Sequence, residues 1–354
     1  MSCWLAFLPV VALLGRGETA EQKAPSVLPA VVYRDYVFTH YLDTTRRQRP
    51  YVISVQPLNH SGVKISFDRG GPRNNFESLF VRGSVLVVGA NVFIPSRGGA
   101  DGDTRSDDTV SYVSPDRLCD AKWLHVEPDG KPVKYPDAGN HVYPVMWGRR
   151  SEFPPLNSDL APGATEIVHT AVAAAGDRDL LVFDLVRTVP ARDKPAPTPK
   201  IAVTRLVPEE RARVTGFGIG SWGQPEVKAA GELMSVFSEP FQAYLLGDDY
   251  YFVTKSGSVF RSLPPTKGAA RTMSAVWDKP KSPVRFIISD GNRTGVHLLV
   301  TAREQGGWEY FRLGPDPKPQ VLSDVDFGDD ETPPEVVYKL AVLLREKKEI
   351  VTPK

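Results

Sequence analysis

The sequence is poor in cysteine, which limits how the chain can be cross-linked. Its 354 residues include two cysteines, Cys3 and Cys119, and Cys3 lies in an apolar segment at the N-terminus. If that segment is removed, Cys119 has no partner left for an intramolecular disulfide bond. No histidine–carboxylate or histidine–amide pair is indicated near Cys119, so we interpret it as a structural thiol rather than a reactive one.

The sequence also lacks an excess of either charge. It has 43 lysines and arginines against 42 aspartates and glutamates, giving a formal net charge of +1. This balance creates no overall field that would attract nucleic acid or an acidic membrane surface, so we expect no nucleic-acid partner. After the N-terminal segment, no apolar run is long enough to span a bilayer as a helix, so we expect no transmembrane segment in the mature chain.

Recognisable catalytic motifs are missing as well. The glycine-rich stretch TGFGIGSWG at 215–223 is preceded by polar residues, whereas a dinucleotide loop follows a buried strand and opens a helix. Ser221 does not stand in a Gly-x-Ser-x-Gly motif, because Ile219 occupies the position of the first glycine. The six histidines are scattered and no pair has metal-binding spacing. The catalytic residues are therefore unknown, enzyme activity is uncertain, and we favour a protein that is not an enzyme.

Proline and glycine are abundant, with 32 and 29 residues. Proline lacks a backbone donor and glycine permits positive φ, so both separate short strands and loops. Between them lie short apolar runs such as YVISVQPL at 51–58, VKISFD at 63–68 and DLLVFDLVRTV at 179–189. Runs of this kind indicate β-strands, so we predict an all-β fold built mainly from antiparallel meanders.

Two segments repeat one scheme and suggest the architecture. The stretch LLGDDYYFVTKSGSVF at 245–260 reads as strand, polar turn, strand, turn and strand, and 284–314 repeats this order about 40 residues later. That spacing is close to the blade length of a β-propeller. We therefore favour an irregular β-propeller, with a β-sandwich as the second choice and a mixed α+β fold as the third.

The predicted main domain covers 25–330 and a C-terminal helix follows it. Residues 333–350 place apolar side chains on one helical stripe, two prolines in the first turn and basic residues near the end, as in a helix that caps a sheet. Residues 164–177 could form either a short helix or a strand. The proline-rich segments 190–200 and 314–320 should be extended and exposed.

The N-terminal residues resemble a secretory signal in outline. An apolar core at 4–14 is followed by Gly15 and Gly17, which permit cleavage after residue 17, although no basic residue precedes the core. We therefore expect 1–17 to be a signal peptide and the protein to be exported to the periplasm or the extracellular space. Asn59 and Asn292 begin acceptor sequences for N-glycosylation.

The most suggestive acidic cluster is GGADGDTRSDD at 98–108. Asp101, Asp103, Asp107 and Asp108 lie close together among flexible glycines, and calcium prefers several oxygen ligands from such a loop. The spacing does not match the twelve-residue calcium loop, and a solvated acidic loop is the competing interpretation. Calcium is the one ion we consider here, and no other cofactor is expected.

These observations lead to three hypotheses of function. The first is an exported β-rich binding or interaction protein whose partner is a protein or a glycan. The second is a secreted hydrolase, acting for example on polysaccharide, with a site assembled from distant loops; tryptophans such as Trp277 and Trp308 could stack on sugars, although core packing is the more common role. The third is a structural component of the cell envelope.

Overall fold

The structure of the protein is a computed structural model. It describes residues 27–42, 51–58, 65–69, 79–82, 85–91, 107–113, 142–148, 161–176, 179–192, 194–207, 226–264, 271–293, 295–328 and 331–351. The predicted signal peptide lies outside these residues and stays a prediction. Within them, no helix has both the length and the apolar character needed to cross a membrane.

Twenty strands follow one another along the described chain in five groups of four, which we call blades 1 to 5. Blade 1 comprises β1 (Leu28–Tyr33), β2 (Tyr36–Leu42), β3 (Tyr51–Pro57) and β4 (Ile65–Arg69). Blade 2 comprises β5 (Leu79–Arg82), β6 (Val85–Asn91), β7 (Asp107–Val113) and β8 (Val142–Gly148). Blade 3 comprises β9 (Thr165–Ala175), β10 (Asp179–Thr188), β11 (Lys200–Val207) and β12 (Glu226–Met234). Blade 4 comprises β13 (Phe241–Leu246), β14 (Asp249–Thr254), β15 (Val259–Ser262) and β16 (Met273–Trp277), and blade 5 comprises β17 (Val284–Asp290), β18 (His297–Ala302), β19 (Trp308–Arg312) and β20 (Gln320–Ser323).

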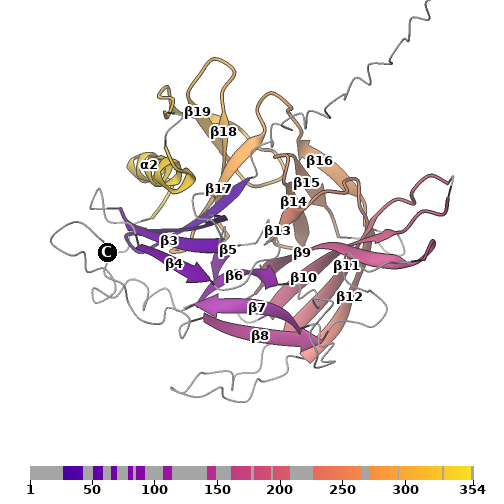
Figure 1. Ribbon diagram of the computed structural model, residues 1–354. Helices are drawn as coiled ribbons and strands as arrows, with labels where there is room; N and C mark the ends of the chain where they lie inside the picture. Colours follow the sequence, from indigo (N-terminus) through magenta and orange to yellow (C-terminus); the bar gives the residue numbers. More distant parts are fainter. Residues whose placement is uncertain are drawn as a thin grey trace, which may run out of the picture.

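Each blade is an antiparallel meander in which neighbours along the chain are neighbours in the sheet. Figure 1 shows the blades succeeding one another around the middle of the molecule. Radial repetition of four-stranded sheets is the architecture of a β-propeller. The favoured fold prediction is confirmed.

The propeller is irregular where the ring closes. The first strand of blade 1, β1, pairs in parallel with the first strand of blade 5, β17, so these two blades form one continuous eight-stranded sheet. We call this junction the seam. Strand β1 reads LPAVVY and is buried along its middle, as expected for a parallel strand covered on both faces.

Apolar layers lie between blades 3 and 4 and between blades 4 and 5. Blades 3 and 4 share a core in which Phe183, Phe241 and Phe252 meet edge to face, with ring centroids 5.3 to 5.5 Å apart. Blades 4 and 5 share a second core that contains Tyr251 and Phe311. Edge-to-face aromatic pairs add to the stabilisation from burial, so these layers fix one blade against the next.

The predicted C-terminal helix is present as α2 (Pro333–Glu346). It lies against the eight-stranded sheet, where Val337, Leu340 and Leu344 are fully buried beside residues of β1, β17 and β18. At its start the backbone N–H of Thr332 donates to the Glu335 carboxylate at 2.7 Å, which satisfies one of the free donors of the first turn. The helix therefore covers the seam, and it ends four residues earlier than the predicted boundary at 350.

A group of hydrogen bonds, which we call the seam clasp, ties the chain together beside the helix. The Arg34 N–H donates to Asn292 Oδ1 at 2.7 Å, and Asn292 Nδ2 donates to the Val351 carbonyl at 2.9 Å. The buried carboxylate of Asp290 accepts from the N–H groups of Asn292 and Val351 at 3.0 and 2.8 Å. The turn after β1, the turn after β17 and the C-terminal segment therefore meet at one amide side chain.

The local predictions can be compared element by element. The strand–turn–strand pattern at 245–260 is confirmed by β13, β14 and β15, with Gly247 at a φ of 61° in the first turn. The ambiguous segment 164–177 is a strand, because β9 pairs with β10 along its length. In the proline-rich segment 190–200, the described residues 190–192 and 194–199 form no strand and are mostly exposed, as predicted.

Candidate functional site

The predicted calcium loop falls largely outside the described residues. Asp101 and Asp103 are not among them, whereas Asp107 and Asp108 begin strand β7 and pair with Gly148 and Trp147 of β8. The two halves of the cluster therefore cannot be placed relative to each other, and the calcium site stays a prediction. Elsewhere, the described part of the chain holds no group of three histidine, cysteine or carboxylate side chains that could bind a metal.

One polar hollow lies between blades 4 and 5. It has a volume of about 260 Å³ and forms where the connection from β16 to β17 faces the turn from β18 to β19. Pockets for drug-sized ligands span roughly 300–1,000 Å³ and are mostly apolar, so this hollow suits a smaller and more polar molecule. Its lining residues carry charges or hydrogen-bonding groups: Lys279, Ser282, Arg303, Glu304, Gln305 and Glu309.

The blade 4 side of the polar hollow is built on Trp277. The indole stacks on Phe311 with ring centroids 4.4 Å apart, and its Nε1 donates to the Ser282 carbonyl at 3.0 Å. The Lys279 ammonium lies 4.1 Å from the centroid of the same indole, and the Ser282 N–H donates to the Lys279 carbonyl at 3.0 Å. The buried indole thus fixes the 279–282 turn and attracts the lysine by a cation–π interaction.

The blade 5 side is a tight turn pressed against the end of β20. The Arg303 N–H donates to the Gly307 carbonyl at 3.0 Å, and the Gly307 N–H donates to Asp326 Oδ1 at 2.8 Å. Gly307 has a φ of 77°, and a Cβ there would collide with the backbone of Ser323. The Arg303 guanidinium forms an ion pair with Asp324. Glycine is therefore required for this approach, which holds Arg303 at the rim.

The acceptors of the polar hollow come from the same hairpin. Glu309 lies in β19 and accepts a hydrogen bond from Thr301 Oγ1 at 3.3 Å, whereas Glu304 and Gln305 lie exposed at the apex of the turn. Ammonium and amide groups donate, carboxylates accept, and a serine hydroxyl does both. The arrangement can therefore satisfy a ligand that carries several hydroxyl groups.

One serine–histidine contact invites comparison with a nucleophile and its base. Ser289 Oγ lies 2.7 Å from His297 Nδ1, and the two residues pair directly across β17 and β18. Ser289 is 4% exposed, and the His297 ring packs on Tyr244 with centroids 4.4 Å apart. Desolvation lowers the pKa of His297 to about 4. A hydroxyl buried this deeply cannot meet a substrate, so we assign the pair to packing between blades.

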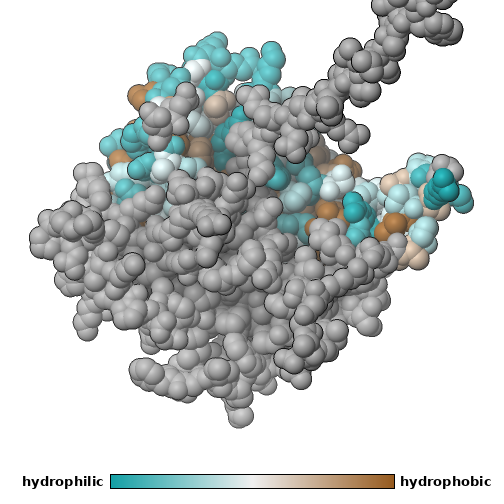
Figure 2. Space-filling view, in the orientation of Figure 1, coloured by the Kyte–Doolittle hydropathy of each residue, from teal (hydrophilic) through white to brown (hydrophobic). Residues whose placement is uncertain are grey.

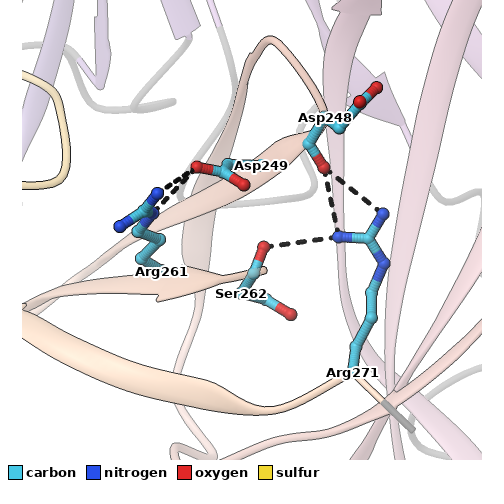
Figure 3. Close-up of polar contacts among 5 residues, drawn as sticks. All are labelled: Asp248, Asp249, Arg261, Ser262 and Arg271. Carbon is cyan, nitrogen blue, oxygen red and sulfur yellow. Dashed lines mark hydrogen bonds and ion pairs between the residues drawn. The ribbon is translucent and has the colours of Figure 1, made fainter. Parts of the chain in front are cut away.

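Two arginines, Arg261 and Arg271, make structural contacts at the end of blade 4 that contains the β13–β14 turn. Figure 3 shows the Arg271 guanidinium donating to the backbone carbonyls of Asp248 and Ser262, each at 3.3 Å. Its carbon lies 3.8 Å from the centroid of the Tyr250 ring. Arg261 donates to the Asp249 carboxylate at 2.5 and 2.9 Å. These contacts tie the β13–β14 turn to β15 and to the segment just before β16.

Six large apolar side chains are exposed among the described residues. They belong to Val227, Met234, Val236, Leu263, Val321 and Val325. Figure 2 shows brown and teal residues interspersed over the coloured part of the surface.

The sequence did not reveal the polar hollow. Lys279 and Arg303 belong to different blades, and their meeting depends on how blade 4 packs on blade 5. The available signal was Trp277, one of the tryptophans considered for sugar stacking. In the structure Trp277 is 4% exposed and packs in the core. It contributes to the hollow by fixing the 279–282 turn through its hydrogen bond to the Ser282 carbonyl.

Comparisons with known proteins show no family for this chain. No protein-family model matches it, and no curated protein matches it in sequence. The chain therefore has to be interpreted from its own residues.

Solved structures resemble the fold distantly. A prolyl endopeptidase chain is 14% identical with a TM-score of 0.29, and the match covers 85% of this chain and 42% of that one. The sialidase of Trypanosoma rangeli is 9% identical with a TM-score of 0.30, covering 82% and 43%. The β-propeller domain of the Trilobed protease from Pyrococcus furiosus is 9% identical with a TM-score of 0.27, covering 85% and 96%. The chain spans less than half the length of the endopeptidase and sialidase chains, and likenesses this distant carry no argument about activity.

Proposed function

We propose that this protein is an exported, non-catalytic binding protein whose ligand is a small hydroxyl-rich molecule, such as the end of an oligosaccharide. The observation that carries the proposal is the polar hollow, where Lys279 and Gln305 offer donors and Glu309 offers acceptors within one small volume. Opposite charges balance around it, which favours a neutral polar ligand over an ion.

The rigidity of the hollow supports this proposal. Trp277 fixes one wall through its hydrogen bond and its stacking on Phe311, and Gly307 fixes the other through its approach to β20. A wall that is already ordered loses little conformational entropy when a ligand binds. The backbone of the two turns that carry the lining side chains is therefore ordered before a ligand binds.

The proposal is tested by titrating the full-length protein with maltotriose, cellotriose and chitotriose in a calorimeter. We expect at least one sugar to bind, and Glu309→Gln to weaken that binding by about tenfold, which corresponds to the loss of one charge-assisted hydrogen bond. Lys318→Ala is the matched control, because Lys318 is 82% exposed and does not line the hollow. Absence of binding to all three sugars, or equal binding by the Glu309→Gln variant, would contradict the proposal.

A hydrolase remains the alternative because the hollow contains two carboxylates, Glu304 and Glu309. Glycoside hydrolysis uses a pair of such groups on either side of the scissile bond. Release of reducing ends during incubation with the same three sugars, abolished in the Glu309→Gln variant, would replace the binding proposal with the hydrolase.

A further inference from the structure

The turn after β17 contains a chemically labile pair of residues. Asp290 ends β17 and Gly291 follows it, within the sequence SDGNRTG at 289–295. In an aspartate–glycine pair the backbone nitrogen of the glycine can attack Cγ of the aspartate, because glycine has no Cβ to hinder the approach. The N–Cγ bond forms, one molecule of water leaves, and the product is a five-membered succinimide ring. Water then opens the ring at either carbonyl and gives aspartate or isoaspartate.

The folded structure holds both reacting groups. Asp290 is 3% exposed, and its two carboxylate oxygens accept from the N–H groups of Asn292 and Val351 at 3.0 and 2.8 Å. The Gly291 N–H donates to the Val32 carbonyl of β1 at 2.7 Å. Cyclisation removes the proton of this N–H and one oxygen of the carboxylate, so it breaks hydrogen bonds on both sides. These contacts therefore oppose the reaction while the seam is closed.

The protecting contacts come from parts of the chain that meet only at the seam. Val32 belongs to β1, Val351 follows the C-terminal helix, and the Asn292 amide bridges the Arg34 N–H and the Val351 carbonyl. Local opening of a structure breaks such a group of contacts together. Opening of the seam therefore releases the glycine nitrogen and the aspartate carboxyl at the same time.

We propose that Asp290 is a modification site whose conversion to isoaspartate is controlled by the seam: the closed seam blocks the reaction and an open seam permits it. Isoaspartate adds a carbon atom to the backbone, which moves Asn292 relative to Arg34 and Val351. The seam clasp then cannot form again with its original geometry, so a transient opening leaves a permanent change. This site is separate from the polar hollow and does not depend on the proposed function.

The test follows isoaspartate at Asp290 over time in the full-length protein at neutral pH. Fragmentation mass spectrometry of the digested protein locates the modified residue. The same chain in guanidinium chloride gives the rate of the open pair, and Asp101 and Asp129, which also precede glycines, are internal references in that solution. We expect the rate at Asp290 to be at least about tenfold lower in the folded protein than in denaturant.

Two variants loosen the seam clasp in different ways. Asn292→Ala removes the bridging amide, whereas deletion of 351–354 removes the Val351 contact and leaves the residues beside Asp290 unchanged. Each should raise the rate in the folded state by about fivefold or more, as expected for the loss of a hydrogen bond that opposes opening, and leave the rate in denaturant unchanged. Thr294→Ala, which keeps the Asn292 amide, is the matched control and should react at the wild-type rate.

Three results would overturn the proposal. Equal rates at Asp290 in the folded and denatured wild type would show that the closed seam gives no protection. Unchanged rates in the variants that circular dichroism shows to be folded would show that the protection does not come through the seam clasp. Wild-type hydrogen exchange in β1 and β17 of the isoaspartate-containing protein would show that the modification does not keep the seam open, whereas we expect faster exchange there.

Discussion

At the scale of single residues, two buried imidazoles hold the same strand from opposite neighbours. His169 of blade 3 lies with its Nε2 2.8 Å from the Phe241 carbonyl of β13, and His297 of blade 5 packs its ring on Tyr244 of the same strand. Burial lowers the pKa of His169 to about 4, against a slight opposing effect of the Phe241 hydrogen bond. Both imidazoles are therefore neutral at pH 7, where Nε2 of His169 carries the proton that it donates to the carbonyl.

This arrangement predicts a loss of stability in mild acid. Between pH 6.5 and 4 the unfolded chain binds protons at His169 that the folded chain does not, so the free energy of unfolding falls as the pH falls. A decrease of 2.5 pKa units corresponds to about 3 kcal/mol by pH 4 for this 3%-exposed side chain. Denaturant unfolding at pH 7, 5.5 and 4.5 measures the effect. The difference between wild type and His169→Gln should shrink as the pH falls, and a constant difference would contradict the assignment.

At the scale of elements, the C-terminal helix is a structural part of the propeller. Its buried stripe, Val337, Leu340 and Leu344, packs on the sheet that contains the seam. We expect Leu340→Ala to lower the free energy of unfolding by about 2–5 kcal/mol, because the change removes fully buried methyl groups and leaves a cavity. Lys347→Ala, at the exposed C-terminal end of the helix, should cost less than about 0.5 kcal/mol. Chemical denaturation compares the two, and similar values would mean that the stripe does not hold the helix in place.

The same scale shows which elements the sequence could predict. The hairpin turn at Gly306–Gly307 is predicted by two adjacent glycines, which adopt positive φ in the structure. The helix at 333–346 is predicted by its apolar spacing, the prolines of its first turn and the basic residues near its end. Both signals lie within the element that they predict. The parallel pairing of β1 with β17 is not encoded locally, because Leu28 and Phe286 meet only when the ring closes. The polar hollow was missed for the same reason, since its walls belong to two blades.

At the scale of the whole molecule, the ring closes through backbone pairing and a few polar side chains. The seam joins the first and last blades by the parallel ladder of β1 and β17, and the seam clasp adds hydrogen bonds through Asn292 and Asp290. Burial raises the pKa of the Asp290 carboxyl, while the N–H groups of Val351 and Asn292 oppose this change. The buried carboxylate of Asp290 therefore helps to hold the C-terminal segment in place. This contact keeps α2 over the seam.

The seam clasp gives a prediction about the entire ring. Asn292→Ala removes the acceptor of the Arg34 N–H and the donor to the Val351 carbonyl, so we expect a loss of about 1–3 kcal/mol in the free energy of unfolding. Hydrogen exchange should quicken in β1, β17 and the residues after α2, and remain unchanged in blade 3, because the opening is local to the seam. Thr294→Ala is the matched control: it removes the N-glycosylation acceptor pattern and keeps the Asn292 amide. Equal hydrogen exchange in the two variants would mean that the Asn292 amide does not close the ring. Faster exchange in Asn292→Ala alone would show that this asparagine is needed as a hydrogen-bonding partner at the seam.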